Sequence, residues 1–297
     1  MNYDEAIEYI ETVSCSGIMP GLVRIQALLE KTEHPEKKCN VIHVAGTNGK
    51  GSVCSYISSI LMKAGYRVGR YVSPTLFDYR ERIQINDSWI SKADTAYWMS
   101  RVREADEKMQ AEGMEGASAF ELETVMAFLY FKASRCDFVV LETGMGGRLD
   151  ATNYVDNKLL TVITRISLDH VQYLGDTTAK IAAEKAGILR PGVPVVYLDG
   201  DADASAVICR KASELGAIQI PVSKKDYTFL GFRKKYIDFS LRSEYYNYIS
   251  LTLHTIARYQ MENAALAVRA VEVLFRSTDM PDGRMCAAAG CPTVEEI

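Results

Sequence analysis

The stretch VIHVAGTNGKGSVCSY, at residues 41–56, has the residue types of a phosphate-binding loop between a strand and a helix. Its glycines allow positive φ angles, so that consecutive backbone N–H groups at a helix start can cradle phosphate oxygens. Lys50 would supply a cation for the outer phosphates, and the Ser52 hydroxyl is placed to bind Mg²⁺. The usual loop has glycine where Val44 stands and no residue where Gly51 separates the lysine from the serine. A glycine-rich turn with a solvated lysine is the alternative interpretation.

Polar side chains stand at the carboxyl ends of other apolar runs. Ser73 follows YRVGRYV, Glu142 closes DFVVLE, and the pair Asp169 and His170 follows LLTVITRIS. Ligands of an open α/β sheet bind beyond these strand ends, so we expect the groups to face one crevice together with the phosphate loop. Each also has a plainer interpretation as a turn cap, a salt-bridge partner or a structural histidine. Mg²⁺ prefers oxygen ligands, so a histidine ligand would be unusual.

Lys185 lies in TTAKIAAEKAGIL, where helical spacing puts Ile181, Lys185 and Ile188 on one face. Its stem can cover apolar surface while the amine reaches water, which is the interpretation that spacing alone favours. The alternative is an amine buried near an anion, and burial would lower its pKa. A lysine of lowered pKa can react with CO₂ to form a carbamate, an anion able to help hold a metal.

The elements that would position these residues alternate along the chain. The strand-like runs are almost continuously apolar, as expected for strands covered on both faces, and amphipathic helices follow them. This alternation predicts an α/β fold with a doubly wound, mostly parallel sheet. We expect strands at 40–45, 67–72, 137–142, 159–166 and 193–197, and helices at 50–64, 92–110, 120–134, 177–188, 202–215 and 261–277.

Two stretches break this alternation. The segment YRERIQINDSWI, at residues 79–90, alternates around Asn86 and Asp87 and predicts a hairpin that projects from the sheet. Three aromatic-rich, alternating runs in residues 227–253 predict a small antiparallel sheet at one edge.

Composition limits the size, the partners and the cellular compartment that we expect for this protein. The 297 residues suffice for one large or two modest domains. A net charge of −4 gives no basic surface for a nucleic-acid partner. The amino terminus does not resemble a secretory signal, and no apolar run reaches the length of a membrane span. The 7 cysteines show no CxxC spacing, which indicates a reducing compartment, by default the cytoplasm.

Five blocks of the sequence together resemble a known family: HVAGTNGKGS, YVSPTLFDYRERIQIN, LETGMGGRLDATN, ISLDHVQYLGDTTAKIAAEKAGI and YQMENAALAV, in this order. The resemblance is to folylpolyglutamate synthase / dihydrofolate synthase, of the Mur-ligase superfamily, and runs from Tyr3 to about Met285. The extra glycine at position 51 is itself a feature of this family. The resemblance implies the central-domain fold of Mur ligases. It also implies an enzyme that uses ATP to phosphorylate a carboxylate of folate or dihydropteroate, and then joins the amine of L-glutamate to the acyl phosphate.

The resemblance also implies roles at matching positions. Catalytic roles fall to Lys50, Lys185 and His170, with Lys185 carbamylated, which replaces the surface interpretation of that lysine. ATP would contact Thr47, Asn48, Gly49, Lys50, Gly51, Ser52, Gln260 and Asn263, the last two at the adenine. Mg²⁺, in two sites, would be held by Ser52, Ser73, Glu142 and His170. The folate or pterin substrate would contact Leu22, Arg24, Phe120 and Arg148.

We expect residues 1–278 to form the ATP-binding catalytic domain and residues 279–297 to be a linker or tail. The family's further carboxy-terminal domain, which contributes contacts to glutamate and nucleotide, is not expected in this chain. Two other functions stay open: a non-catalytic ATP- or folate-binding remnant, and another Mur-type amino-acid ligase. We expect a monomer with small-molecule substrates.

Overall fold

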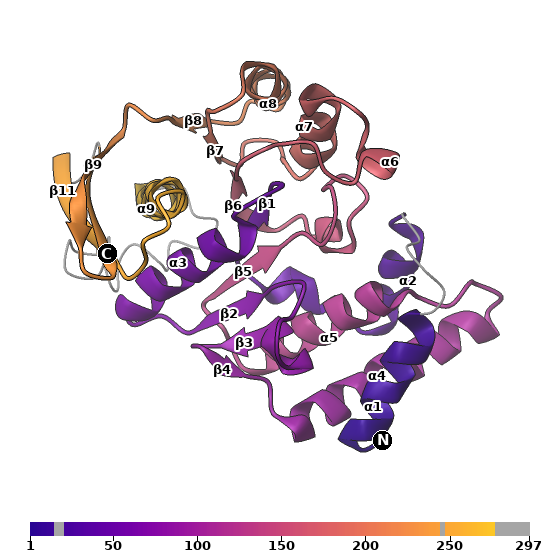
Figure 1. The fold of residues 1–297 in the computed structure, drawn as a ribbon. Helices are drawn as coiled ribbons and strands as arrows, with labels where there is room; N and C mark the ends of the chain where they lie inside the picture. The colour runs from indigo at the N-terminus through magenta and orange to yellow at the C-terminus, as the bar shows by residue number, and fades with distance from the viewer. Residues whose placement is uncertain (15–20, 244–246, 277–297) are drawn as a thin grey trace.

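A large, twisted sheet with helices on both faces forms the centre of the molecule (Figure 1). The computed structural model describes residues 1–14, 21–243 and 247–276. The sheet has 8 strands in the order β4-β3-β2-β5-β1-β6-β7-β8, and every pair from β2 to β8 is parallel. The doubly wound, mostly parallel prediction is therefore confirmed. The strands are β1 (Val41–Ala45), β2 (Val68–Tyr71), β3 (Ile83–Ile85), β4 (Ser88–Trp89), β5 (Phe138–Glu142), β6 (Lys158–Ile163), β7 (Val195–Leu198) and β8 (Gln219–Val222).

Successive residues of the central strands bury into opposite layers, because side chains alternate across a strand. Val139 and Leu141 of β5 pack among the helices of one layer, whereas Phe138 and Val140 pack into the other. The first layer holds α1 (Tyr3–Ser14), α2 (Val23–Lys31), α4 (Lys92–Ala111) and α5 (Ala119–Ala133). The second holds α3 (Lys50–Lys63) and α9 (Gln260–Arg276), which lie against each other in Figure 1. The other helices are α6 (Val171–Leu174), α7 (Thr178–Ala186), α8 (Ala202–Glu214) and the 3₁₀ turns η1 (Pro35–Lys38), η2 (Tyr79–Arg82) and η3 (Ala151–Tyr154).

The aromatic-rich region forms a small antiparallel sheet of β9 (Tyr227–Arg233), β10 (Tyr236–Ser243) and β11 (Asn247–Leu253). It stands apart from the main sheet and does not extend its edge. Its buried face, which includes Ile237 and Phe239, packs into the same core as α9. The antiparallel pairing was predictable from the alternation, but the alternation could not say which surface this face would cover.

The predicted hairpin is present, but it does not project. Asn86 and Asp87 have φ angles of 47° and 60°, as a two-residue hairpin turn requires, and β3 and β4 pair across them. β3 also pairs antiparallel with β2 and so extends the main sheet. A side-chain contact supports this, because Arg70 Nη2 donates to Asp87 Oδ1 at 2.8 Å.

Most expected elements agree with the structure within a few residues, and the differences have local causes. β8 escapes prediction because Pro221 lowers the strand signal, yet proline is tolerated in an edge strand such as this one. Three helices were also missed: α1, the 9-residue α2 and the 4-residue α6. The expected domain boundary at 278 and the tail at 279–297 lie outside the described residues. In the described part of the chain, no helix has the length and apolarity needed to cross a membrane.

Candidate nucleotide and substrate site

The loop between β1 and α3 has a backbone that only glycine accommodates. Gly46 and Gly49 have φ angles of 150° and 93°. A Cβ atom on Gly46 would lie 1.8 Å from Thr164 Oγ1, and one on Gly49 would lie 2.3 Å from Asn263 Oδ1. α3 begins at Lys50 without a side-chain cap. Its first N–H groups are therefore available to an anionic ligand.

The start of the loop is tied to the exit of β6. The backbone N–H groups of Thr47 and Asn48 both donate to Arg165 O, at 2.8 and 3.3 Å. Thr164 Oγ1 donates to Asn48 O at 2.8 Å, and Thr47 Oγ1 donates to Ser167 O at 3.1 Å. Thr47 and Asn48 thus hold the loop in place, and their N–H groups are already bonded in the structure.

Lys50 and Glu142 face each other across the loop. Lys50 Nζ donates to Gly46 O at 3.1 Å and to Thr47 O at 3.4 Å, and it lies 4.0 Å from Glu142 Oε1. Glu142, at the end of β5, is buried and accepts a long 3.4 Å hydrogen bond from Ser73 N. Burial raises the pKa of Glu142 to about 7, although the Lys50 charge and the Ser73 N–H oppose that shift. The carboxylate is therefore short of positive partners.

This shortage fits a bound Mg²⁺. In the described residues, no group of three or more His, Cys, Asp or Glu side chains is arranged to hold a metal. Mg²⁺ needs no such group, because one or two carboxylates with substrate phosphates and waters usually suffice. Glu142 would supply the carboxylate, and Ser52, in the first turn of α3, and Ser73, whose N–H contacts Glu142, would supply hydroxyls. Gly51 lies next to Glu142, since a Cβ at position 51 would be in van der Waals contact with Glu142 Oε2, at 3.5 Å.

His170 is placed differently from the other predicted metal ligands. Its side chain is 50% exposed, and its nearest charged partner is Asp169, at 3.7 Å. The residue itself has a left-handed backbone, with φ 45°, at the start of the short α6. The structure does not gather His170 with Glu142 into a metal-holding group.

Lys185 is buried, which shows that the snorkelling interpretation was wrong. The residue is 2% exposed, and its Nζ donates to Gly46 O at 2.7 Å, directly beneath the phosphate loop. Burial and the neighbouring charge of Lys50 lower the pKa of Lys185 to about 8, despite the opposing charges of Asp169 and Asp150. About a tenth of this amine is thus neutral, and hence nucleophilic, at pH 7, far more than for an ordinary lysine.

The start of α9 lies against the first turn of α3 (Figure 1). Gln260 Nε2 donates to Ser52 Oγ at 3.2 Å, and Tyr56 OH donates to Gln260 Oε1 at 3.3 Å. Asn263 Nδ2 donates to the same Gln260 oxygen at 3.0 Å. The two residues predicted to bind adenine therefore reach the loop from the far end of the sequence.

A pocket of about 630 Å³ lies on the other side of Ser73. It is lined by Ser73, the start of α5, the loop 144–151 and residues of α6 and α7. Of the predicted substrate residues, Phe120 and Arg148 line it. Leu22 instead packs against the core, and Arg24 Nε donates to Glu121 Oε2 at 3.0 Å. Glu121 lines the pocket, so Arg24 contacts a lining residue but does not line the pocket itself.

The sequence argument missed two features of this pocket. Arg82 and the buried Glu123 both line it and form an ion pair at 3.1 Å. Asp150, also buried, accepts from Met145 N at 2.8 Å and shapes the glycine-rich wall. Arg82 and Asp150 lie within the blocks YRERIQIN and LETGMGGRLDATN. A charged residue next to an apolar run is the sequence signal that could have identified them as pocket residues.

Comparison with known proteins agrees with this geometry. Residues 44–271 match the Mur ligase middle domain, and the chain belongs to the Mur ligase family. Within that family it groups with folylpolyglutamate and dihydrofolate synthases. It is 38% identical to dihydrofolate synthase/folylpolyglutamate synthase of Bacillus subtilis over 92% of this chain and 64% of that protein.

Solved structures give the same result. The apo form of Lactobacillus casei folylpolyglutamate synthase superimposes with a TM-score of 0.90 and 30% identity, over 100% of this chain and 70% of that one. A folylpolyglutamate synthase complex with AMPPCP and folate gives a TM-score of 0.88 at 30% identity and the same coverage. The chain thus spans about two thirds of the length of these relatives.

Proposed function

We propose that this protein uses ATP to ligate L-glutamate to a carboxylate of folate or dihydropteroate through an acyl phosphate. The observation that carries the proposal is the position of Ser73. Its N–H donates to Glu142 beside the phosphate loop, and the same residue lines the 630 Å³ pocket. A nucleotide on the loop and a carboxylate in the pocket would therefore meet at Ser73.

The chemistry requires such a junction. Carboxylate and triphosphate are both anions, so their approach needs positive charge between them. Lys50, held by two loop carbonyls and 4.0 Å from the nearest carboxylate oxygen of Glu142, can give its charge to the γ-phosphate. Transfer of that phosphate turns the carboxylate oxygen into a leaving group, and the glutamate amine then attacks the carbonyl carbon and expels phosphate.

We assign Mg²⁺ to Ser52, Ser73 and Glu142, with a second ion nearer the incoming carboxylate. When bound, the metal would neutralise phosphate charge and orient the γ-phosphate. We keep His170 as a candidate ligand of the second ion, and its half-exposed imidazole lies beside Asp169. We also propose a cytoplasmic monomer; the four described cysteines (Cys39, Cys54, Cys136 and Cys209) are free, which fits the reducing compartment but does not bear on the oligomeric state.

Lys185 is the candidate for carbamylation. Its neutral amine would attack CO₂, forming an N–C bond while a C=O electron pair moves to oxygen and the amine proton leaves to solvent. The pKa of about 8 supplies the neutral amine that this step needs. The resulting anion would lie beside Gly46, at the phosphate end of the site.

Phosphate release tests the proposal. The chain is supplied with MgATP, L-glutamate and either dihydropteroate or a reduced folate. We expect release that depends on glutamate and on one of the two pterin substrates, which would name the acceptor. Binding of AMPPCP without any release under either condition would favour a non-catalytic remnant, and stabilisation by a UDP-sugar in place of a pterin would favour another Mur-type ligase.

A further inference from the structure

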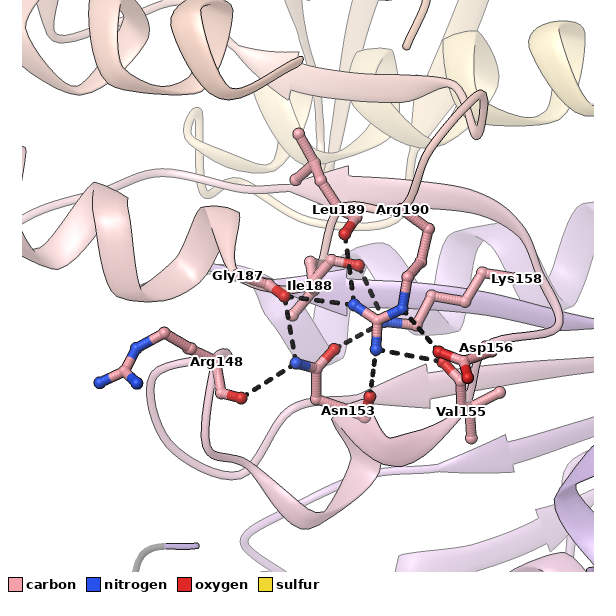
Figure 2. Close-up of polar contacts among 9 residues, drawn as sticks. All are labelled: Arg148, Asn153, Val155, Asp156, Lys158, Gly187, Ile188, Leu189 and Arg190. Carbon is pink, nitrogen blue, oxygen red and sulfur yellow. Dashed lines mark hydrogen bonds and ion pairs between the residues drawn. The ribbon is translucent and has the colours of Figure 1, made fainter. Parts of the chain in front are cut away.

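Three polar side chains surround the carboxyl end of α7, as Figure 2 shows. Asn153 comes from η3, Lys158 from the first position of β6, and Arg190 from the turn after α7. The last carbonyls of a helix have no partner within the helix and need donors from elsewhere. We call these three residues the carbonyl bracket.

Asn153 is the centre of the bracket, and both of its amide hydrogens and its amide oxygen are hydrogen-bonded. Nδ2 donates to Arg148 O and to Gly187 O, both at 3.1 Å, and Oδ1 accepts from Lys158 Nζ at 2.7 Å. Arg148 belongs to the pocket loop, which we define as residues 144–148, and Gly187 caps α7. One buried amide therefore joins the wall of the substrate pocket to the helix that carries Lys185.

Lys158 and Arg190 complete the set of donors. Lys158 Nζ donates to Ile188 O at 2.8 Å, and Arg190 Nη1 donates to Gly187 O and Leu189 O at 3.3 and 3.2 Å (Figure 2). The Arg190 guanidinium is favourable at this helix carboxyl terminus because the helix dipole places partial negative charge there.

Close backbone packing makes the junction rigid. A Cβ on Gly147 would lie 2.8 Å from Glu184 O, and one on Gly187 would lie 2.5 Å from Arg148 Cβ. Arg148 N donates to Glu184 O at 2.8 Å, which is the direct backbone link between the pocket loop and α7. A shift of either element would therefore move the other.

α7 transmits this placement to the phosphate loop through Lys185, which contacts Gly46 O at 2.7 Å. We propose that Asn153 is a positioning residue, whose amide fixes the pocket loop relative to the helix that brings Lys185 to the phosphate loop. The substrate part of this proposal rests on the proposed function, since it takes the pocket to bind a folate-class carboxylate. Asn153 itself is 3% exposed, does not line the pocket and acts only through the groups it holds.

Asn153→Asp isolates this role. The carboxylate keeps the contact with Lys158 but cannot donate to Arg148 O or Gly187 O. We expect folate affinity, measured by calorimetry, to fall about 10- to 100-fold, by analogy with the effect of removing an outer partner of a metal ligand. The affinity for MgAMPPCP should change less than about threefold, because the N–H groups of α3 and Lys50 are untouched. Hydrogen exchange of the Arg148 amide should accelerate at least about tenfold, together with that of residues 184–187 but not of α3.

Two further variants make the test decisive. Lys158→Met removes the donor to Ile188 O and keeps the apolar stem. It should show the same weakened folate binding and faster exchange as Asn153→Asp, and it replaces that variant in the test if Asn153→Asp does not fold. Asp156→Asn is the matched control, because the Asp156 side chain bonds to Arg190 Nε at the outer edge of the bracket and is 90% exposed, and its backbone contact with Lys158 N is kept. We expect wild-type affinities and exchange for it.

Equal loss of both ligands, or faster exchange throughout α3 and β1, would overturn the proposal in favour of a purely structural role. Unchanged folate affinity and unchanged Arg148 exchange in Asn153→Asp would also overturn it. If the wild-type protein binds no folate, the proposed function fails. In that case the positioning role is tested by hydrogen exchange alone: faster exchange of the Arg148 amide and of residues 184–187 in Asn153→Asp supports it, and unchanged exchange overturns it.

Discussion

Lys158 and Lys185 are two buried lysines with different surroundings, 5% and 2% exposed. Among the described residues, neither has a carboxylate within salt-bridge distance. Lys158 is held by two acceptors at 2.7 and 2.8 Å, whereas Lys185 has a single carbonyl at 2.7 Å, which Lys50 also contacts. Burial lowers the pKa of both, that of Lys158 well below its ordinary value and that of Lys185 to about 8.

The difference separates a structural region from a ligand site. In the carbonyl bracket, donors and acceptors are matched, so little capacity is left for a ligand. Around the phosphate loop, Lys50, Lys185 and the carboxylate of Glu142 are incompletely paired and their charges are close together. Such unmet polar capacity in a buried place is costly, and it is typical of sites that a charged ligand completes.

The largest effect is expected from Lys50→Ala, which tests whether the loop side is a ligand site at all. Loss of this cation should cost roughly 2 kcal/mol or more of AMPPCP binding, about 30-fold, since a buried charge contact is removed. Calorimetry measures it, with Lys63→Ala as the control, because Lys63 is an exposed lysine in the last turn of the same helix. Unchanged affinity in Lys50→Ala would refute the loop assignment.

Replacing each buried lysine by methionine compares the two regions directly. Lys158→Met strands Asn153 Oδ1 and Ile188 O, so the free energy of unfolding should fall by about 1–3 kcal/mol. Lys185→Met leaves Gly46 O bonded to Lys50, so the free energy of unfolding should stay within about 1 kcal/mol of wild type or rise.

Urea denaturation measures the free energy of unfolding of both variants. It is done at neutral pH, which is below the lowered pKa of Lys185. In that range the folded state carries the full cost of the buried charge, and methionine removes this cost. Equal destabilisation by the two substitutions would erase the proposed distinction between bracket and ligand site.

The pH dependence of metal binding tests whether Glu142 is a metal ligand at the phosphate loop. With a pKa of about 7, Glu142 is mostly protonated at about pH 6 and mostly ionised at about pH 8. The Mg²⁺-dependent part of AMPPCP affinity should therefore rise about tenfold over this range, because a metal ligand must be deprotonated. Glu142→Gln should remove the rise while leaving Mg²⁺-free binding in place. A rise that persists in this variant would take Glu142 out of the metal site.

The same raised pKa has a consequence for stability. Between the ordinary carboxyl pKa and about 7, the folded state holds a proton that the unfolded state has lost. The contribution of Glu142 to stability is therefore present at low pH and is lost as the pH rises through this window. Glu142→Gln should flatten this part of the pH–stability curve in thermal melts.

The smallest effect is expected from Asp156→Asn on the bracket side. The Arg190–Asp156 contact at 2.9 Å is an ion pair with an exposed partner, so its loss should cost less than about 0.5 kcal/mol. Chemical denaturation of Asp156→Asn and Lys158→Met, side by side, compares the exposed ion pair at the outer edge of the bracket with its buried hydrogen bonds. A loss as large as that of Lys158→Met would show that stability depends on the rim ion pair.

The local features of this protein were predictable from the sequence. The phosphate loop follows from a strand, closely spaced glycines and a helix start, all within residues 41–56, and the alternation of elements places polar strand ends at one edge of a parallel sheet. Glu142 and Ser73 meet there as expected. The hairpin turn at Asn86 and Asp87 was equally local.

Tertiary structure decided which polar groups are buried and what they contact, because these depend on residues far apart in the chain. Lys185 reaches Gly46 across 139 positions, so spacing within its helix could not reveal its burial. In the same way, Arg24 turns to Glu121, and His170 stays half-exposed beside Asp169. Asn153 joins the pocket loop to α7 only because the connection that runs from the exit of β5 to the start of β6 passes the end of α7.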